Sequence, residues 1–196
     1  MPSIQTLVAD LNNGSILGVG AKPDAAVTNL ESVISDALKV KHKFVHMNAT
    51  ISGASRLSCA AAATSISFNG SYVHFEDGWS TIGNMDINRL IVASGNFSGC
   101  TYKIYRSAPG VFKCVHIARP GGVNANALVT SMATYAGQVG WTELVAIPTV
   151  GFIGNNGCTE LYVVSQLFYN QRIDSILLQI NSQGLIVGRA VTSVAV

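Results

Sequence analysis

Charged side chains are scarce in this chain of 196 residues. Asp, Glu, Lys and Arg make up 11% of it, whereas soluble domains average roughly 25%. Hydrophobic residues make up 48%, a content that argues against disorder and against a long charged coiled coil. The formal net charge is +2, and the densest group of basic residues is the short segment 39–43. The sequence therefore argues against binding to nucleic acid.

The sequence also lacks the segments that direct proteins to or through membranes. No apolar run is long enough for a membrane-spanning helix. The first residues include Asp10 and no basic lead, so no cleavable signal peptide is expected. The four cysteines form neither a Cys-x-x-Cys pair nor a dense disulfide pattern. Internal repeats and linkers are missing as well, which predicts a single domain over residues 1–196.

What the sequence does contain is a series of short strand patterns joined by turn residues. Alternating apolar positions predict strands from residue 43 onward, and Asn69-Gly70 predicts a hairpin turn. Three segments have helical spacing instead: residues 4–11, 28–38 and 124–137. The expected fold is therefore α+β, with a mixed or antiparallel β-sandwich core flanked by about three helices.

The segment 94–122 carries the residues with the clearest chemistry. It predicts a strand, then a corner formed by Ser98, Gly99 and Cys100, then a hairpin whose returning strand holds His116. Residues near the open end of a hairpin oppose each other, so this spacing places Cys100 beside His116. A thiol next to an imidazole can attack a carbonyl, with the imidazole acting as the base.

Two further residues add to this candidate site. Gly99 permits a positive φ or a close backbone approach, and the Cys100 backbone N–H could then donate to an oxyanion. Ser94 stands six residues before the cysteine and could orient the His116 ring through a hydrogen bond. The predicted site consists of Cys100, His116 and Ser94, with Ser98 and Gly99 at its corner.

This arrangement resembles a known family. The Ser-Gly-Cys sequence at residues 98–100, followed by His116, is similar to the signature of the cytotoxic necrotizing factor and Burkholderia lethal factor family of toxin glutamine deamidases. The likeness covers the middle of the chain and extends to three flanking stretches, residues 85–86, 115–117 and 123–126.

The resemblance implies a reaction and partners. Cys100 would be the nucleophile and His116 the base, and Ser94 would steer the imidazole because it stands where the family has an active-site threonine. The enzyme would hydrolyse a glutamine side chain of a host protein, such as a Rho-family GTPase or a translation-initiation helicase, to glutamate through a Cys-thioester. No cofactor and no metal is expected. The chain would be a monomer that is secreted or injected into the host cytosol.

Three other interpretations remain open. The Cys100–His116 pair would equally serve a thiol protease or a transglutaminase, because these enzymes share the acyl-enzyme chemistry. Cys114 leaves the same face of its strand as His116 and would complete a Cys, Cys, His zinc site. A non-catalytic β-sandwich binding module would also suit the low charge.

Overall fold

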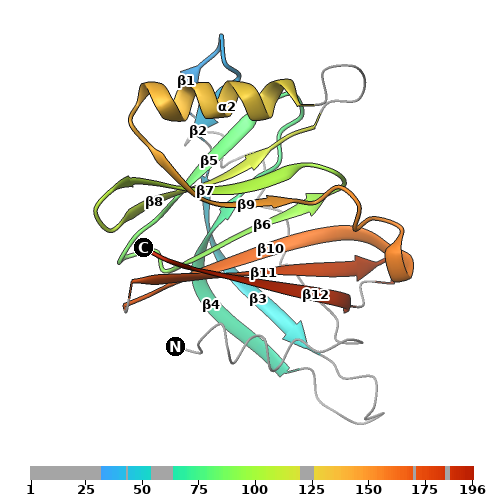
Figure 1. Cartoon of the computed structure of the whole chain (residues 1–196). Helices are drawn as coiled ribbons and strands as arrows, with labels where there is room; N and C mark the ends of the chain where they lie inside the picture. The colour runs from blue at the N-terminus through green and yellow to red at the C-terminus, as the bar shows by residue number, and fades with distance from the viewer. Residues whose placement is uncertain (1–31, 43, 54–63, 120–125, 170, 184–185) are drawn as a thin grey trace.

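The protein is described here from a computed structural model, which covers residues 32–42, 44–53, 64–119, 126–169, 171–183 and 186–196. The strands form two six-stranded sheets (Figure 1). The first sheet has the order β1 (Ser32–Ser35), β2 (Val40–His42), β5 (Ser80–Met85), β8 (Val111–Ile117), β7 (Thr101–Ala108) and β9 (Thr142–Pro148). The second has the order β12 (Ile186–Ala195), β11 (Arg172–Asn181), β10 (Cys158–Phe168), β6 (Ile91–Phe97), β4 (Thr64–Val73) and β3 (Phe44–Gly53).

Both sheets are mixed. Most neighbouring strands are antiparallel, but β2 and β5 run parallel in the first sheet and β4 and β6 run parallel in the second. The two sheets face each other across a shared apolar core. Tyr102 and Ile104 of β7 point into it from one side, and Val163 of β10 and Leu177 of β11 from the other. Full burial of such side chains contributes about 1.5–3 kcal/mol each.

The outer face of the first sheet carries a second core under the helix α2 (Ala127–Gln138), which crosses the β1 and β2 end of the sheet in Figure 1. Leu128, Met132 and Ala136 recur every four residues, so they share one face of the helix, and all three are buried there. A short 3-10 turn, η2 (Asn155–Gly157), precedes β10. Among the described residues, no helix has the length and apolar character needed to cross a membrane.

The prediction of β-rich, mixed sheets is confirmed, but the expected number of helices is wrong. The part of the chain that the structure describes contains one α-helix, α2, rather than about three. The helix expected over residues 28–38 is a strand and a turn where it is described, because β1 pairs with β2. Val33 and Ile34 are 52% and 36% exposed, whereas Leu38 packs against the core under α2, so the apolar residues of this segment do not share one buried face. The helix expected over residues 4–11 lies outside the described residues.

The hairpin turn expected at Asn69-Gly70 is also wrong. Both residues lie inside β4, where they pair with Asn48 and Met47 of β3. Continuous pairing along ten residues of β3 and β4 outweighs the local turn preference of Asn-Gly. The hairpin expected after Cys100, by contrast, is formed by β7 and β8, and it turns at Pro109-Gly110, where Gly110 adopts φ +70.

Candidate active site

His116 lies on the inner face of β8, between the two sheets. Tyr102 of β7 is its direct cross-strand partner, and the residue is 1% exposed. Its imidazole stacks on the Phe97 ring of β6, with centroids 3.9 Å apart and planes 7° apart. The Phe75 ring lies at 5.3 Å with a tilt of 54°. The rings of Phe97 and Phe75 therefore restrict the position of the His116 imidazole.

Ser94 reaches the same imidazole from β6. Its Oγ lies 2.9 Å from His116 Nδ1 and donates a hydrogen bond of 2.7 Å to the carbonyl oxygen of Val73. A hydroxyl has one proton, and a carbonyl can only accept. Ser94 therefore accepts at the imidazole, and Nδ1 carries the ring proton. The unprotonated nitrogen is Nε2, the position that a general base needs.

The surroundings keep this imidazole neutral. Burial, and to a lesser extent the charge of His74, lowers the pKa of His116 to about 3. The Nε2 atom is itself buried and has no hydrogen-bond partner among the described residues. A buried acceptor without a donor costs about 1–3 kcal/mol. The ring thus presents a free lone pair in the space between the sheets.

Cys100 is held at a corner just before β7. Gly99 has φ +129, a conformation that favours glycine and that the sequence anticipated for this corner. Thr149 donates twice to the Cys100 carbonyl oxygen, from its backbone N at 3.1 Å and from Oγ1 at 2.6 Å. These two bonds fix the backbone of the candidate nucleophile, and Thr149 is fully buried.

Cys100 and His116 face the same side of the sheet. Thr101 pairs with Ile117 and Tyr102 pairs with His116, so Cys100 is the diagonal neighbour of His116 rather than its direct partner. Side chains in such positions lie on one face, with Cα atoms roughly 7–8 Å apart. Because Nε2 has no partner in the described structure, the thiol is not hydrogen-bonded to it.

Cys100 is buried, with 5% of the residue exposed. Burial raises the pKa of Cys100, and hydrogen bonds from the backbone of Arg119, Ser98 and Cys100 itself oppose this effect. A raised pKa keeps the sulfur protonated at neutral pH. The resting pair is therefore a neutral thiol and a neutral imidazole, and backbone N–H groups lie beside the sulfur.

Cys114 lies in the same core cluster as Cys100, but its thiol interacts with the Tyr102 hydroxyl. Cys114 is fully buried, and burial raises the pKa of its thiol to about 12, against a smaller opposite effect of the Tyr102 hydroxyl. No group of three His, Cys, Asp or Glu side chains in the described ranges could hold a metal ion. The structure therefore does not gather Cys100, Cys114 and His116 into a zinc site.

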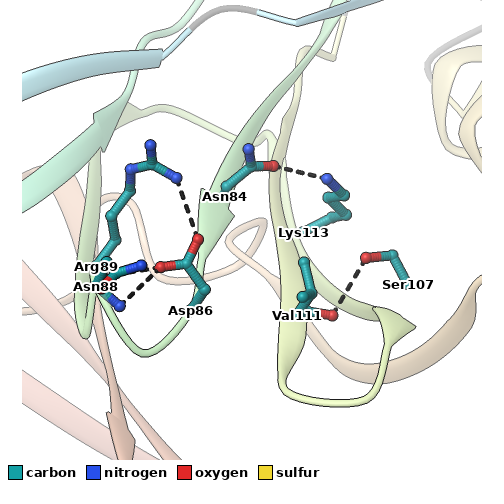
Figure 2. A network of polar contacts seen from close by, with 7 residues as sticks. All are labelled: Asn84, Asp86, Asn88, Arg89, Ser107, Val111 and Lys113. Atoms are coloured by element: carbon teal, nitrogen blue, oxygen red, sulfur yellow. Dashed lines mark hydrogen bonds and ion pairs between the residues drawn. The ribbon is translucent and has the colours of Figure 1, made fainter.

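Asp86, part of the stretch that resembles the toxin family, has a local structural role (Figure 2). Its Oδ1 accepts hydrogen bonds from the backbone N of Asn88 and Arg89, and its Oδ2 pairs with Arg89 Nη1 at 3.1 Å. This carboxylate stabilises the turn between β5 and β6. Figure 2 shows Lys113 bonded to Asn84 nearby.

Two hollows lie near the β7–β8 hairpin. One of about 230 Å³ adjoins the candidate site on the outer side of the corner and is lined in part by Gly99, Thr101 and Arg119. The other, of about 560 Å³, lies at the turn end of the hairpin, where Arg106 and Phe112 contribute to its wall. Neither is lined by Cys100 or His116.

Sequence reasoning missed Phe97, Val73 and Thr149. Phe97 stands directly before the Ser98 corner, so an aromatic residue beside a candidate cysteine was the available signal. Thr149 lies 49 residues after Cys100, and no spacing rule connects the two. Val73 acts through its backbone carbonyl, which side-chain identity does not reveal.

Comparison of the chain with protein-family models, with curated proteins and with solved structures finds no match in any of the three.

Proposed function

We propose that the protein is a cysteine-dependent glutamine deamidase that converts a glutamine of a target protein to glutamate. The observation that carries the proposal is the ring of His116. Its Nδ1 proton is committed to Ser94, whereas its Nε2 lone pair is buried, unpartnered and on the same face as Cys100. Most buried polar atoms in folded proteins have a hydrogen-bond partner, so an unpartnered acceptor on the face that carries a thiol supports a chemical role.

In the proposed reaction, the Cys100 sulfur attacks the carboxamide carbon while its proton passes to His116 Nε2. The tetrahedral intermediate then breaks its C–N bond, and the Nε2 proton leaves with the nitrogen as ammonia. Water next attacks the thioester carbon, giving its proton to Nε2. The C–S bond breaks, and the proton returns from Nε2 to sulfur. The product leaves as the carboxylic acid, which then gives its remaining proton to the released ammonia or to solvent.

The neutral resting pair suits this substrate. A carboxamide carries no charge, so its entry into a buried, apolar site has a far lower desolvation cost than that of a carboxylate or an ammonium group. The long glutamine side chain suits a recessed thiol. Backbone N–H groups near the sulfur are candidates for stabilising the oxyanion. The family resemblance adds a target class, a host Rho-family GTPase or translation-initiation helicase, and action in the host cytosol.

The test is incubation of the purified protein with a eukaryotic cell lysate, followed by peptide mass spectrometry. We expect a small set of glutamines to acquire the mass of glutamate in the presence of the wild-type protein. The matched control is Cys100→Ser, which keeps the size of the side chain and removes the thiolate chemistry. Cys114→Ser controls for loss of a thiol elsewhere in the core.

The outcomes separate the competing functions. Glutamine-to-glutamate conversion that Cys100→Ser abolishes and Cys114→Ser retains supports the proposal. New peptide termini instead indicate a protease, and glutamine–amine crosslinks indicate a transglutaminase. Identical peptide maps for the wild-type and Cys100→Ser proteins rule out all three and leave a binding module.

A further inference from the structure

The strand β6 contains a bulge next to the candidate site. Its pairing with β10 matches Gly95 to Tyr162 and Phe97 to Leu161. Leu161 and Tyr162 are consecutive in β10, but their partners in β6 have one more residue between them. That extra residue is Asn96. An extra residue of this kind redirects the side chains that follow it, and bulges are frequent beside active sites.

The bulge changes which residues of β6 point inward. Side chains of a regular strand alternate, so Ser94 and Phe97, which are three positions apart, would lie on opposite faces. With Asn96 inserted, Ser94 opposes Val163 and Phe97 opposes Leu161. Ser94, Phe97, Leu161 and Val163 are all fully buried between the sheets. One strand therefore contributes two neighbouring contacts to the same face.

Both contacts meet the His116 ring. Ser94 bonds its edge at Nδ1, 2.9 Å away, and Phe97 covers its face with centroids 3.9 Å apart. The edge contact selects the tautomer, and the face contact fixes the plane in which Nε2 lies. The imidazole turns about its Cβ–Cγ bond, so an edge contact and a face contact together restrict its orientation more than either contact does alone.

The outer side of the same bulge is closed by Gly95. A Cβ at this position would overlap the Tyr162 ring and would lie 2.9 Å from Tyr72 Oη. Only glycine therefore allows Tyr162 to pack against the backbone of β6 at this point. The conformation of the bulge depends on the absence of a side chain there.

We propose that the β6 bulge is a positioning device for the general base and that Phe97 is the positioning residue it supplies. The bulge converts a three-residue spacing in the sequence into two contacts on one imidazole. Its catalytic meaning rests on the proposed deamidase function, but the orientation of the ring can be measured without any substrate.

The experiment is nitrogen-15 NMR of the His116 ring in wild-type protein, Phe97→Leu and the control Phe112→Leu. Phe112 is a buried phenylalanine of the same core cluster, and it is not among the rings that contact His116 in the described structure. In the wild type we expect the Nδ1–H tautomer and contacts between the rings of His116 and Phe97. Phe97→Leu should keep the Nδ1–H tautomer that Ser94 sets but shift the ring signals, because the plane of the ring is no longer fixed, whereas Phe112→Leu should keep the wild-type signals.

Gly95→Ala provides a second route, because it disturbs the bulge while both contacting side chains remain. We expect it to shift the His116 signals in the same direction as Phe97→Leu. If both Phe→Leu variants alter the ring equally, or if Phe97→Leu and Gly95→Ala leave it unchanged, the proposal is wrong. A folded Gly95→Ala protein keeps the test decisive even if Phe97→Leu does not fold.

Activity separates this proposal from the proposed function. For an active enzyme, Phe97→Leu should lower kcat for ammonia release roughly 10- to 100-fold with little change in KM, because the base is misplaced. Phe112→Leu should stay near the wild type. If the NMR signals change as expected but even the wild-type protein releases no ammonia, the bulge positions the ring and the deamidase assignment is wrong.

Discussion

Two polar clusters lie side by side between the sheets, and they differ in whether they are complete. In one, the Tyr102 hydroxyl lies 3.1 Å from Ser165 Oγ, which lies 2.7 Å from Ser175 Oγ. Each of these hydroxyls has a partner. In the other, Ser94 and Val73 satisfy one edge of His116 and leave Nε2 open. Because Tyr102 is the cross-strand partner of His116, the two clusters share one environment. The difference is that the first cluster consists of mutually bonded hydroxyls, whereas the second leaves one ring nitrogen without a partner among the described residues.

We expect the largest effect from His116→Phe, which tests whether the cluster with the unpartnered nitrogen differs in function from the fully bonded cluster. The change removes the open acceptor, so ammonia release should fall by about 10²- to 10⁴-fold, the usual contribution of a general base. The free energy of unfolding in urea should change by less than about 1 kcal/mol, because Ser94 still donates to Val73 and an unsatisfied nitrogen is lost. Full activity, or a large loss of stability without loss of activity, would contradict the proposed role of His116.

Replacing Ser94 tests the closed edge of the same ring. Ser94→Ala leaves His116 Nδ1–H and the Val73 carbonyl without their partner, which should lower the free energy of unfolding by about 1–3 kcal/mol. Ammonia release should fall by about 10- to 100-fold because the ring loses its orientation. Ser94→Thr is the control, since it keeps the hydroxyl and adds a methyl that restricts the rotamer. An Ala variant as active as the Thr variant would remove Ser94 from the site.

The neutral state of His116 predicts how stability depends on pH. In the unfolded chain the imidazole takes up a proton near pH 6.5, but burial lowers the pKa of the folded state to about 3. The contribution of His116 is therefore fully present above pH 6.5 and is lost as the pH falls from 6.5 toward 3, by up to about 1.4 kcal/mol for each pH unit. Urea unfolding of the wild type and of His116→Phe between pH 7 and pH 4 measures this contribution as the difference between their free energies of unfolding. Parallel curves would show that the ring is not held neutral.

Tyr102→Phe should have the smallest effect. It tests the cluster of Tyr102, Ser165 and Ser175, in which every hydroxyl has a partner. It removes one hydroxyl, and Ser165 remains bonded to Ser175. We expect a loss of about 1 kcal/mol in the free energy of unfolding, the net value of one buried hydrogen bond. Ammonia release should stay within about twofold of the wild type. If activity falls as far as in Ser94→Ala, the two clusters act as one network and the distinction fails.

The local part of this architecture could be predicted from the sequence. Alternating apolar residues and the Pro109-Gly110 turn defined the β7–β8 hairpin, and the hairpin placed Cys100 near His116 on one face. Helix α2 followed from its regular spacing of apolar residues. These features depend on neighbours within one or two elements, for which periodicity is a sufficient guide.

The rest depended on contacts between distant segments. The segment 28–38 has a helical pattern, but its described residues pair with β2, and Asn69-Gly70 lies within a strand because β3 pairs along it. The bulge at Asn96 is visible only against the register of β10. Thr149 approaches Cys100 through the connection after β9. Propensity rules do not include these long-range pairings, so they predict the wrong element or no contact at all.

The bond between Ser94 and His116 has a consequence for how the protein reaches its functional state. The two residues belong to different sheets, and Val73, which accepts from Ser94, belongs to a third strand, parallel to β6. Contacts between segments far apart in sequence form slowly during folding. The imidazole can acquire its proton arrangement only after the sheets have docked. Recovery of the His116 tautomer after dilution from urea would therefore time the final docking of the sheets, later than the formation of the β7–β8 hairpin.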